Sequence, residues 1–169
     1  MNRAIGAAAL FFLALIIVGG IGYAAGLRVN TSSSIPRGLW IEITPGKIVR
    51  GDIVVACLPP DQIQRRYLGA GFCETGLEPV VKLVVAVAGD AVEVTDDGVS
   101  VNGYLLPNSS PMRRDGAGRP LLRATGFSIV PPGSVWLVVE RPDSFDSRYI
   151  GPVPVDYIKG TATPLAVWR

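Results

Sequence analysis

Histidine is absent from the 169 residues, and cysteine occurs only twice. Without histidine there is no Ser-His or Cys-His nucleophile, no HExxH zinc site and no histidine pH switch. Two cysteines are too few for a four-cysteine zinc site, so no metal site is expected. The net charge of +2 lacks the basic excess typical of nucleic-acid binding. Any enzymatic chemistry must therefore use Ser, Thr, Lys, Tyr, Asp, Glu or Arg.

Charge is also missing from residues 4–27, an apolar run between Arg3 and Arg28. A helix of this length would extend roughly 36 Å, enough to cross a bilayer. A cleavable signal peptide is the alternative, with small residues near Ala24, but the run is longer than a usual signal h-region. We expect residues 1–27 to be a membrane anchor or uncleaved signal segment. Residues 28–169 would form a periplasmic domain held at the inner membrane.

The rest of the chain predicts a mainly β fold. Short apolar, β-branched segments are separated by Pro, Gly, Asn and Asp, as in compact antiparallel folds. A hairpin is expected over 90–102, with its turn at Asp97-Gly98. A short helix is expected over 61–69 and a surface loop over 108–120. The other expected strands cover 39–44, 52–58, 79–88 and 133–140.

Lys82 stands in an apolar run over residues 80–88. If the run is a strand, the residues on both of its faces are apolar, which predicts a strand buried on both faces. Burial there would disfavour the ammonium form and lower the lysine pKa, making the neutral amine a competent general base. The alternative is a lysine that snorkels to the surface near a strand end.

Ser34 is the candidate nucleophile. It lies at most about 25 Å of extended chain beyond Leu27, so it could meet a substrate leaving the bilayer. Pro36 favours an extended Ile35, and Gly38 permits a sharp turn, which could expose the hydroxyl. The alternative is a polar spacer after the anchor.

Cys57 and Cys73 flank the helix expected over 61–69. In an exported domain they could form a disulfide that closes a loop of about 15 residues and stabilises by roughly 3 kcal/mol. Two buried thiols are the alternative.

Several motifs in order resemble the membrane-bound signal peptidases that use a Ser/Lys dyad. They are Ser34-Ile-Pro36, Lys82 in a strand that leads to Gly89-Asp90, the 97–103 hairpin, and the string Ser144-Phe-Asp-Ser-Arg-Tyr-Ile-Gly151. The opening 28–39 segment, the phrase Gly69-Ala-Gly-Phe-Cys73 and the closing string resemble the conjugal-transfer (TraF) branch of this family.

The resemblance implies a signal-peptidase-like antiparallel β catalytic domain with one N-terminal transmembrane helix. It implies a serine endopeptidase, without cofactor, that matures a conjugative pilin precursor at the membrane and joins its ends into a ring. Other transfer-apparatus proteins are further candidate partners. By motif, Ser34 is the nucleophile, Lys82 the general base and Asp146 an essential acidic residue. Ser144 would orient the lysine amine, and Ser32 would assist the backbone N–H of Ser34 in the oxyanion site.

The chain departs from the signal-peptidase pattern in two places. Only Ile35 separates Ser34 from the proline, where signal peptidases have two residues, and Leu83 follows the lysine where arginine is common. Arg148 is then the nearest charge partner for Asp146, in a catalytic or a purely structural pair. Two other functions stay open: a signal peptidase that only hydrolyses exported precursors, and a non-catalytic anchored β-domain of the transfer apparatus.

Overall fold

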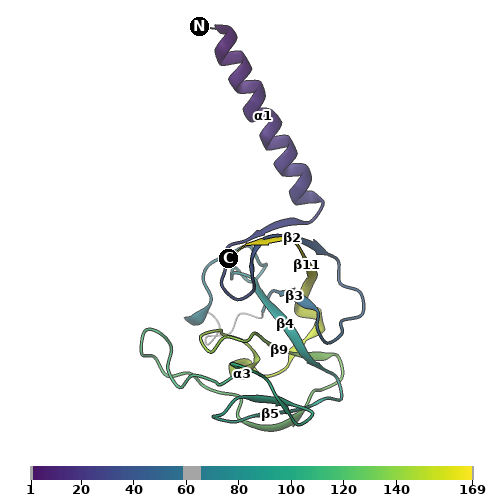
Figure 1. The fold of residues 1–169 in the computed structure, drawn as a ribbon, viewed down its shortest axis with the longest axis vertical. Helices are drawn as coiled ribbons and strands as arrows, with labels where there is room; N and C mark the ends of the chain where they lie inside the picture. The colour runs from purple at the N-terminus through teal and green to yellow at the C-terminus, as the bar shows by residue number, and fades with distance from the viewer. Residues whose placement is uncertain (1, 59–65, 169) are drawn as a thin grey trace.

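A computed structural model describes residues 2–58 and 66–168 of the chain. Helix α1 (Asn2–Ala24) projects away from a β-rich body (Figure 1). Its segment Ile5–Ala24 has a mean hydropathy of 2.5, and none of it is buried against the protein. The helix is therefore long and apolar enough for the expected membrane anchor or signal sequence, and it contributes nothing to the core of the body.

The junction between α1 and the body depends on a glycine and an ion pair. Gly26 has φ +88°, and a Cβ there would collide with the carbonyl oxygen of Glu42. The Glu42 N–H donates to the Gly26 carbonyl at 2.8 Å. Arg28 Nε donates to Glu42 Oε2 at 2.8 Å, and its guanidinium lies 4.1 Å from the centre of the Tyr23 ring. The end of the helix is thus fixed against the second strand.

The body consists of two antiparallel sheets joined by short turns. The larger has the order β1-β2-β11-β3-β4-β9-β10, and the smaller the order β7-β6-β5-β8. The strands are β1 (Leu27–Asn30), β2 (Arg37–Ile43), β3 (Ile53–Ala56), β4 (Val80–Val87), β5 (Ala91–Val94), β6 (Val99–Val101), β7 (Tyr104–Leu105), β8 (Gly126–Ile129), β9 (Ser134–Val138), β10 (Val153–Pro154) and β11 (Ile158–Trp168). Helix α3 (Ser147–Ile150) and the 3-10 turn η1 (Val155–Tyr157) lie between β9 and β11.

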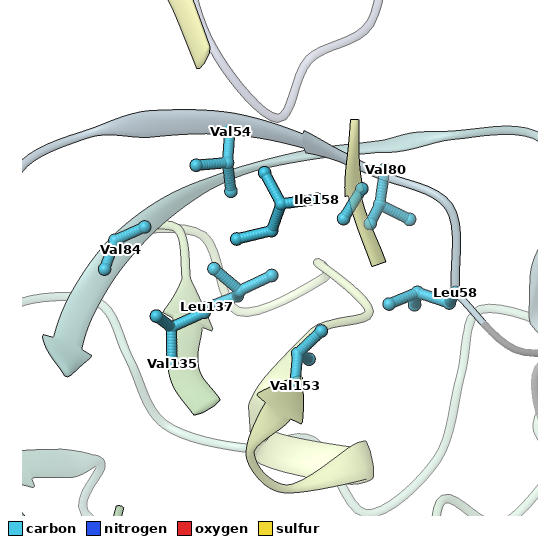
Figure 2. Packing of buried hydrophobic residues seen from close by; sticks show 9 residues of the cluster. Val54, Leu58, Val80, Val84, Val135, Leu137, Val153 and Ile158 are labelled. Carbon is cyan, nitrogen blue, oxygen red and sulfur yellow. The ribbon is translucent and has the colours of Figure 1, made fainter. Parts of the chain in front are cut away.

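The main core lies against the centre of the larger sheet. Valine, leucine and isoleucine side chains from β3, β4, β9 and β11 converge there, as Figure 2 shows. A second cluster joins the smaller sheet to β4 and β9, around Val92, Val99 and Trp136. β4 and β9 contribute to both clusters, so these two strands connect the two parts of the core.

β4 corrects one expectation. Residues 80, 82, 84 and 86 are buried, but 81, 83, 85 and 87 are only half-buried, so the strand is not enclosed on both faces. Lys82 lies on the fully buried face and is only 5% exposed. A run that is apolar at nearly every position cannot distinguish a strand buried on both faces from one buried on a single face, because half-buried positions also accept valine and leucine.

The expected strands and hairpin agree with the structure, and of the two alternatives for the cysteines it contains the disulfide. The strands expected over 39–44, 52–58, 79–88 and 133–140 are β2, β3, β4 and β9, and β5 and β6 form the expected hairpin. Cys57 and Cys73 are disulfide-bonded, with their Cα atoms 5.6 Å apart. The helix expected over 61–69 falls largely outside the described residues.

Candidate active site

Ser34 lies in the connection between β1 and β2. Its neighbour Ile35 is 8% exposed and packs with Trp40 of β2 and Val139 in a separate apolar cluster. Trp40 Nε1 also donates to the Pro36 carbonyl at 3.1 Å, so this tryptophan belongs to the core of the body. The buried side chain of Ile35 and the hydrogen bond to Pro36 therefore fix the backbone that follows Ser34, and with it the position of the Ser34 hydroxyl.

Asn30, the last residue of β1, holds the same connection through its side-chain amide. Its Nδ2 donates to the carbonyls of Ser32, Ile35 and Pro36 at 3.1 to 3.3 Å. Its Oδ1 accepts from the Ser32 N–H and from Ser32 Oγ, the latter at 2.7 Å. One side chain thus fixes the backbone on both sides of Ser34 and takes the hydroxyl hydrogen of Ser32.

Lys82 reaches Ser34 from the middle of β4. Its Nζ lies 3.1 Å from Ser34 Oγ and donates to Ser144 Oγ at 2.8 Å. Burial lowers the pKa of Lys82 below its usual 10.5, an effect that the charge of Asp146 opposes and that of Arg148 reinforces. The hydrogen-bond partners of the amine are thus two hydroxyls. A hydroxyl can hydrogen-bond to a neutral amine as well as to an ammonium, so these contacts do not require the lysine to be charged.

Ser144 belongs to a short segment that ends in α3 and contains a fully buried ion pair. Asp146 is the N-cap of α3 and accepts from the Arg148 backbone N–H. Arg148 Nε and Nη2 donate to the two oxygens of Asp146 at 2.8 Å each, and neither side chain is exposed. Arg148 Nη2 also donates to the carbonyls of Arg141 and Ser144, at 2.6 and 3.2 Å. The pair therefore fixes the backbone that carries Ser144.

A cavity of about 890 Å³ opens onto these groups. Ser34, Lys82 and Ser144 line it at one place, and Tyr67, Phe72 and Phe145 supply aromatic walls. Gly19 and Tyr23 of α1 line the same cavity, so it continues from the hydroxyl and amine to the apolar helix. No group of His, Cys, Asp and Glu side chains suitable for a metal ion occurs among residues 2–58 and 66–168.

The arrangement pairs a hydroxyl with a buried amine at the wall of a cavity, which is the pairing of nucleophile and base that covalent catalysis through a serine requires. The family model of signal peptidase, peptidase S26, matches residues 3–168. This chain belongs to the signal peptidase family, peptidase S26. Its mostly antiparallel β body with one N-terminal apolar helix agrees with the fold class expected from the motifs.

Relatives within the family carry a transfer name. The plasmid transfer protein TraF of Escherichia coli is 44% identical over 163 residues, 92% of this chain and 90% of the relative. The conjugal transfer protein TraF of Agrobacterium tumefaciens is 38% identical over 168 residues, 93% and 94% of the two chains. A crystal structure of signal peptidase I from Enterococcus faecalis V583 aligns with a TM-score of 0.43 and 26% identity, covering 70% of this chain and 98% of that chain.

The structure brings together Ser34, Lys82 and Ser144, and it pairs Asp146 with Arg148, which also donates to the Ser144 carbonyl. Ser32 lines the cavity, but its hydroxyl hydrogen is directed to Asn30 rather than into the open space.

Sequence reasoning missed Asn30 and Arg141. Arg141 Nη1 donates to the Ser33 carbonyl at 3.2 Å across a sequence separation of 108. No local pattern marks such a contact, whereas an asparagine before a serine-rich turn is a recognisable capping signal.

Proposed function

We propose that this chain is a membrane-associated serine endopeptidase that matures a conjugative pilin precursor by acyl transfer through Ser34. The observation that carries the proposal is the 3.1 Å separation between Ser34 Oγ and Lys82 Nζ, with the amine buried and its pKa lowered. In a chain without histidine, Lys82 is the side chain able to act as a base there.

In the first half-reaction, the Ser34 hydroxyl attacks the scissile carbonyl while its proton moves to Lys82 Nζ. For this step the amine is neutral, so that its lone pair takes the Ser34 proton across the 3.1 Å separation while an N–H donates to Ser144 Oγ. Ser144 therefore fixes the rotation of the amine. The carbonyl π electrons move to oxygen, and the backbone N–H of Ser34 stabilises the oxyanion. Ser32 can add a second donor only if its hydroxyl leaves Asn30.

The tetrahedral intermediate then collapses, which completes the first half-reaction. The C–N bond breaks, the leaving amine takes the proton from Lys82, and an acyl-enzyme remains on Ser34. In the second half-reaction, the precursor's own N-terminal amine or a water molecule attacks the ester carbonyl while Lys82 Nζ takes its proton. The C–O bond to Ser34 then breaks, and Ser34 Oγ takes that proton back. Attack by the amine releases a ring, whereas attack by water releases a linear chain. We propose the ring, in keeping with the transfer name of the relatives.

The proposed location follows from the continuity between cavity and helix. The cavity that holds Ser34 also touches Gly19 and Tyr23 of α1. With α1 in the inner membrane, a precursor segment leaving the bilayer on the periplasmic side enters the cavity without diffusing through water. We propose the membrane and the pilin precursor as partners, with other transfer-apparatus proteins nearby.

The test is the full chain with Ser34→Ala, co-produced with a conjugative pilin precursor and followed by intact-mass analysis. The parent should yield a product one water lighter than the linear mature chain, and Ser34→Ala should leave the precursor uncut. Processing by Ser34→Ala would refute the nucleophile and favour a non-catalytic anchored β-domain. A linear product from the parent would favour a signal peptidase that only hydrolyses.

A further inference from the structure

Arg141 contacts the peptide group that joins Ser33 to Ser34. Its Nη1 donates to the Ser33 carbonyl at 3.2 Å. The other side of its guanidinium is held by Asp143, with Nε at 3.0 Å from Oδ1 and Nη2 at 2.7 Å from Oδ2. A guanidinium paired in this bidentate way has a fixed plane, which leaves Nη1 aimed at the carbonyl.

The backbone of Arg141 is fixed as well. Its carbonyl accepts from Arg148 Nη2 at 2.6 Å and from the Ser144 N–H at 3.3 Å. Arg148 is itself locked in the buried pair with Asp146. The segment 141–148 therefore delivers two groups to the site: Ser144 to the lysine amine, and Arg141 to the backbone beside the nucleophile.

A peptide group is planar, and in its trans form the carbonyl and the N–H point in opposite directions. Fixing the Ser33 carbonyl therefore fixes the direction of the Ser34 N–H. A charge-assisted bond to the carbonyl also polarises the peptide and makes its N–H a stronger donor. Among the described residues, no protein group accepts a hydrogen bond from the Ser34 N–H, so this donor is available to a substrate.

We propose that Arg141, oriented by Asp143, is a positioning residue for the oxyanion site: it holds and polarises the Ser33–Ser34 peptide so that the Ser34 N–H points at the developing oxyanion. The inference rests on the proposed function of Ser34 as nucleophile. It assigns a role to a residue that lies outside the Ser34, Lys82 and Ser144 constellation and touches neither amine nor hydroxyl.

The test measures two quantities on the full chain in detergent: cleavage kinetics, and the affinity for a peptide aldehyde that ends in alanine. The aldehyde accepts Ser34 Oγ at its carbonyl carbon, the hydroxyl proton moves to Lys82, and the resulting oxyanion occupies the site under study. Loss of oxyanion stabilisation should weaken aldehyde binding and kcat by the same factor, because both report transition-state complementarity.

For Arg141→Ala we expect kcat and aldehyde affinity each to fall about 10- to 30-fold with KM unchanged, less than the loss when a direct oxyanion donor is removed. Arg141→Lys keeps the charge beside Asp143 but loses the planar fork. It should show most of the same loss, without moving the pH at which activity rises. Arg113→Ala is the matched control, because Arg113 also pairs with an exposed aspartate, Asp96, at 2.8 Å; it should match the parent.

Parent-like kcat and aldehyde affinity in both Arg141 variants would overturn the inference, as would a loss confined to KM. If Arg141→Ala does not fold, as judged by thermal unfolding, Arg141→Lys carries the test. An active Ser34→Ala would refute the proposed function itself. An inactive Ser34→Ala with fully active Arg141 variants would refute only the role of Arg141.

Discussion

Lys82 and Arg148 are two buried basic residues in neighbouring regions with opposite surroundings. Arg148 is fully buried and meets a carboxylate with two 2.8 Å hydrogen bonds. Lys82 is 5% exposed, and within the described part of the chain its amine meets only the hydroxyls of Ser34 and Ser144. Arginine cannot lose its proton, so its burial requires a carboxylate; lysine can, so burial without one favours its neutral form. The fold thus holds the arginine in an ion pair and places the lysine amine beside two hydroxyls, as the proposed role of Lys82 as a base requires.

Lys82→Arg breaks this comparison most severely. The guanidinium stays protonated at every workable pH, so it cannot accept the Ser34 proton. We expect the rate of precursor cleavage to fall by roughly 10²- to 10⁴-fold, measured by intact mass over time. Lys82→Met, which removes the charge, should be equally inactive. Substantial cleavage by Lys82→Arg would mean that Lys82 is not the base.

Asp146→Asn tests the arginine in this comparison by removing the charge of its carboxylate partner. It leaves Arg148 charged and buried without a counter-ion, which should lower the free energy of unfolding by about 3–5 kcal/mol, measured by chemical denaturation. The double variant Asp146→Leu with Arg148→Met removes both charges and should lose clearly less. Equal losses in the single and double variants would show that packing, not an uncompensated charge, determines the cost.

The disulfide provides a more modest test. Cys57 and Cys73 close the loop that carries Tyr67 and Leu68, both of which line the cavity beside Lys82. Replacing both cysteines by serine should lower the free energy of unfolding by roughly 3 kcal/mol. If the loop loosens and water reaches Lys82, its pKa rises and the rise of activity with pH moves to higher pH. Lowered stability with an unchanged dependence of activity on pH would show that the loop does not exclude water from Lys82.

The smallest expected effect is on the pH dependence of stability. Burial lowers the pKa of folded Lys82, while the unfolded residue keeps a value near 10.5. Between these two values the unfolded state binds more protons, so the Lys82 contribution to stability rises with pH, by at most about 1.4 kcal/mol per pH unit. Across this range the parent should gain stability relative to Lys82→Met as the pH rises, so the difference between their free energies of unfolding should change with pH. Parallel curves would mean that the amine is not desolvated.

Parts of the fold were predictable because their signal is local. The uncharged run of α1 and the β-branched runs of β3, β4 and β9 can be recognised from adjacent residues in the sequence. β11 was not expected, although it is the longest strand. It contains Gly160 and Pro164, which argue against a central strand, and its register shifts where it pairs with β3 and with β2. Such bulges bend a strand locally, and their positions depend on the pairing with β2 and β3, which only the tertiary structure specifies.

The candidate site divides in the same way. The absence of histidine and the placement of Lys82 in an apolar run pointed to a lysine base before any fold was considered. The half-buried second face of β4, the bracing of the Ser34 connection by Asn30 and the reach of Arg141 to Ser33 depend on neighbours from other elements. Side-chain contacts between residues so far apart in the chain leave no periodic pattern in the sequence from which they could be predicted.

The sequence by itself determined which groups could do chemistry, since residue types set the acids, bases and nucleophiles, and it determined the elements whose periodicity is local. The tertiary structure alone decided that Lys82 meets Ser34 across 48 residues and Ser144 across 62. The reason is physical: strand pairing and core packing set distances between remote residues, and a pKa depends on the water and charges that those residues exclude or supply.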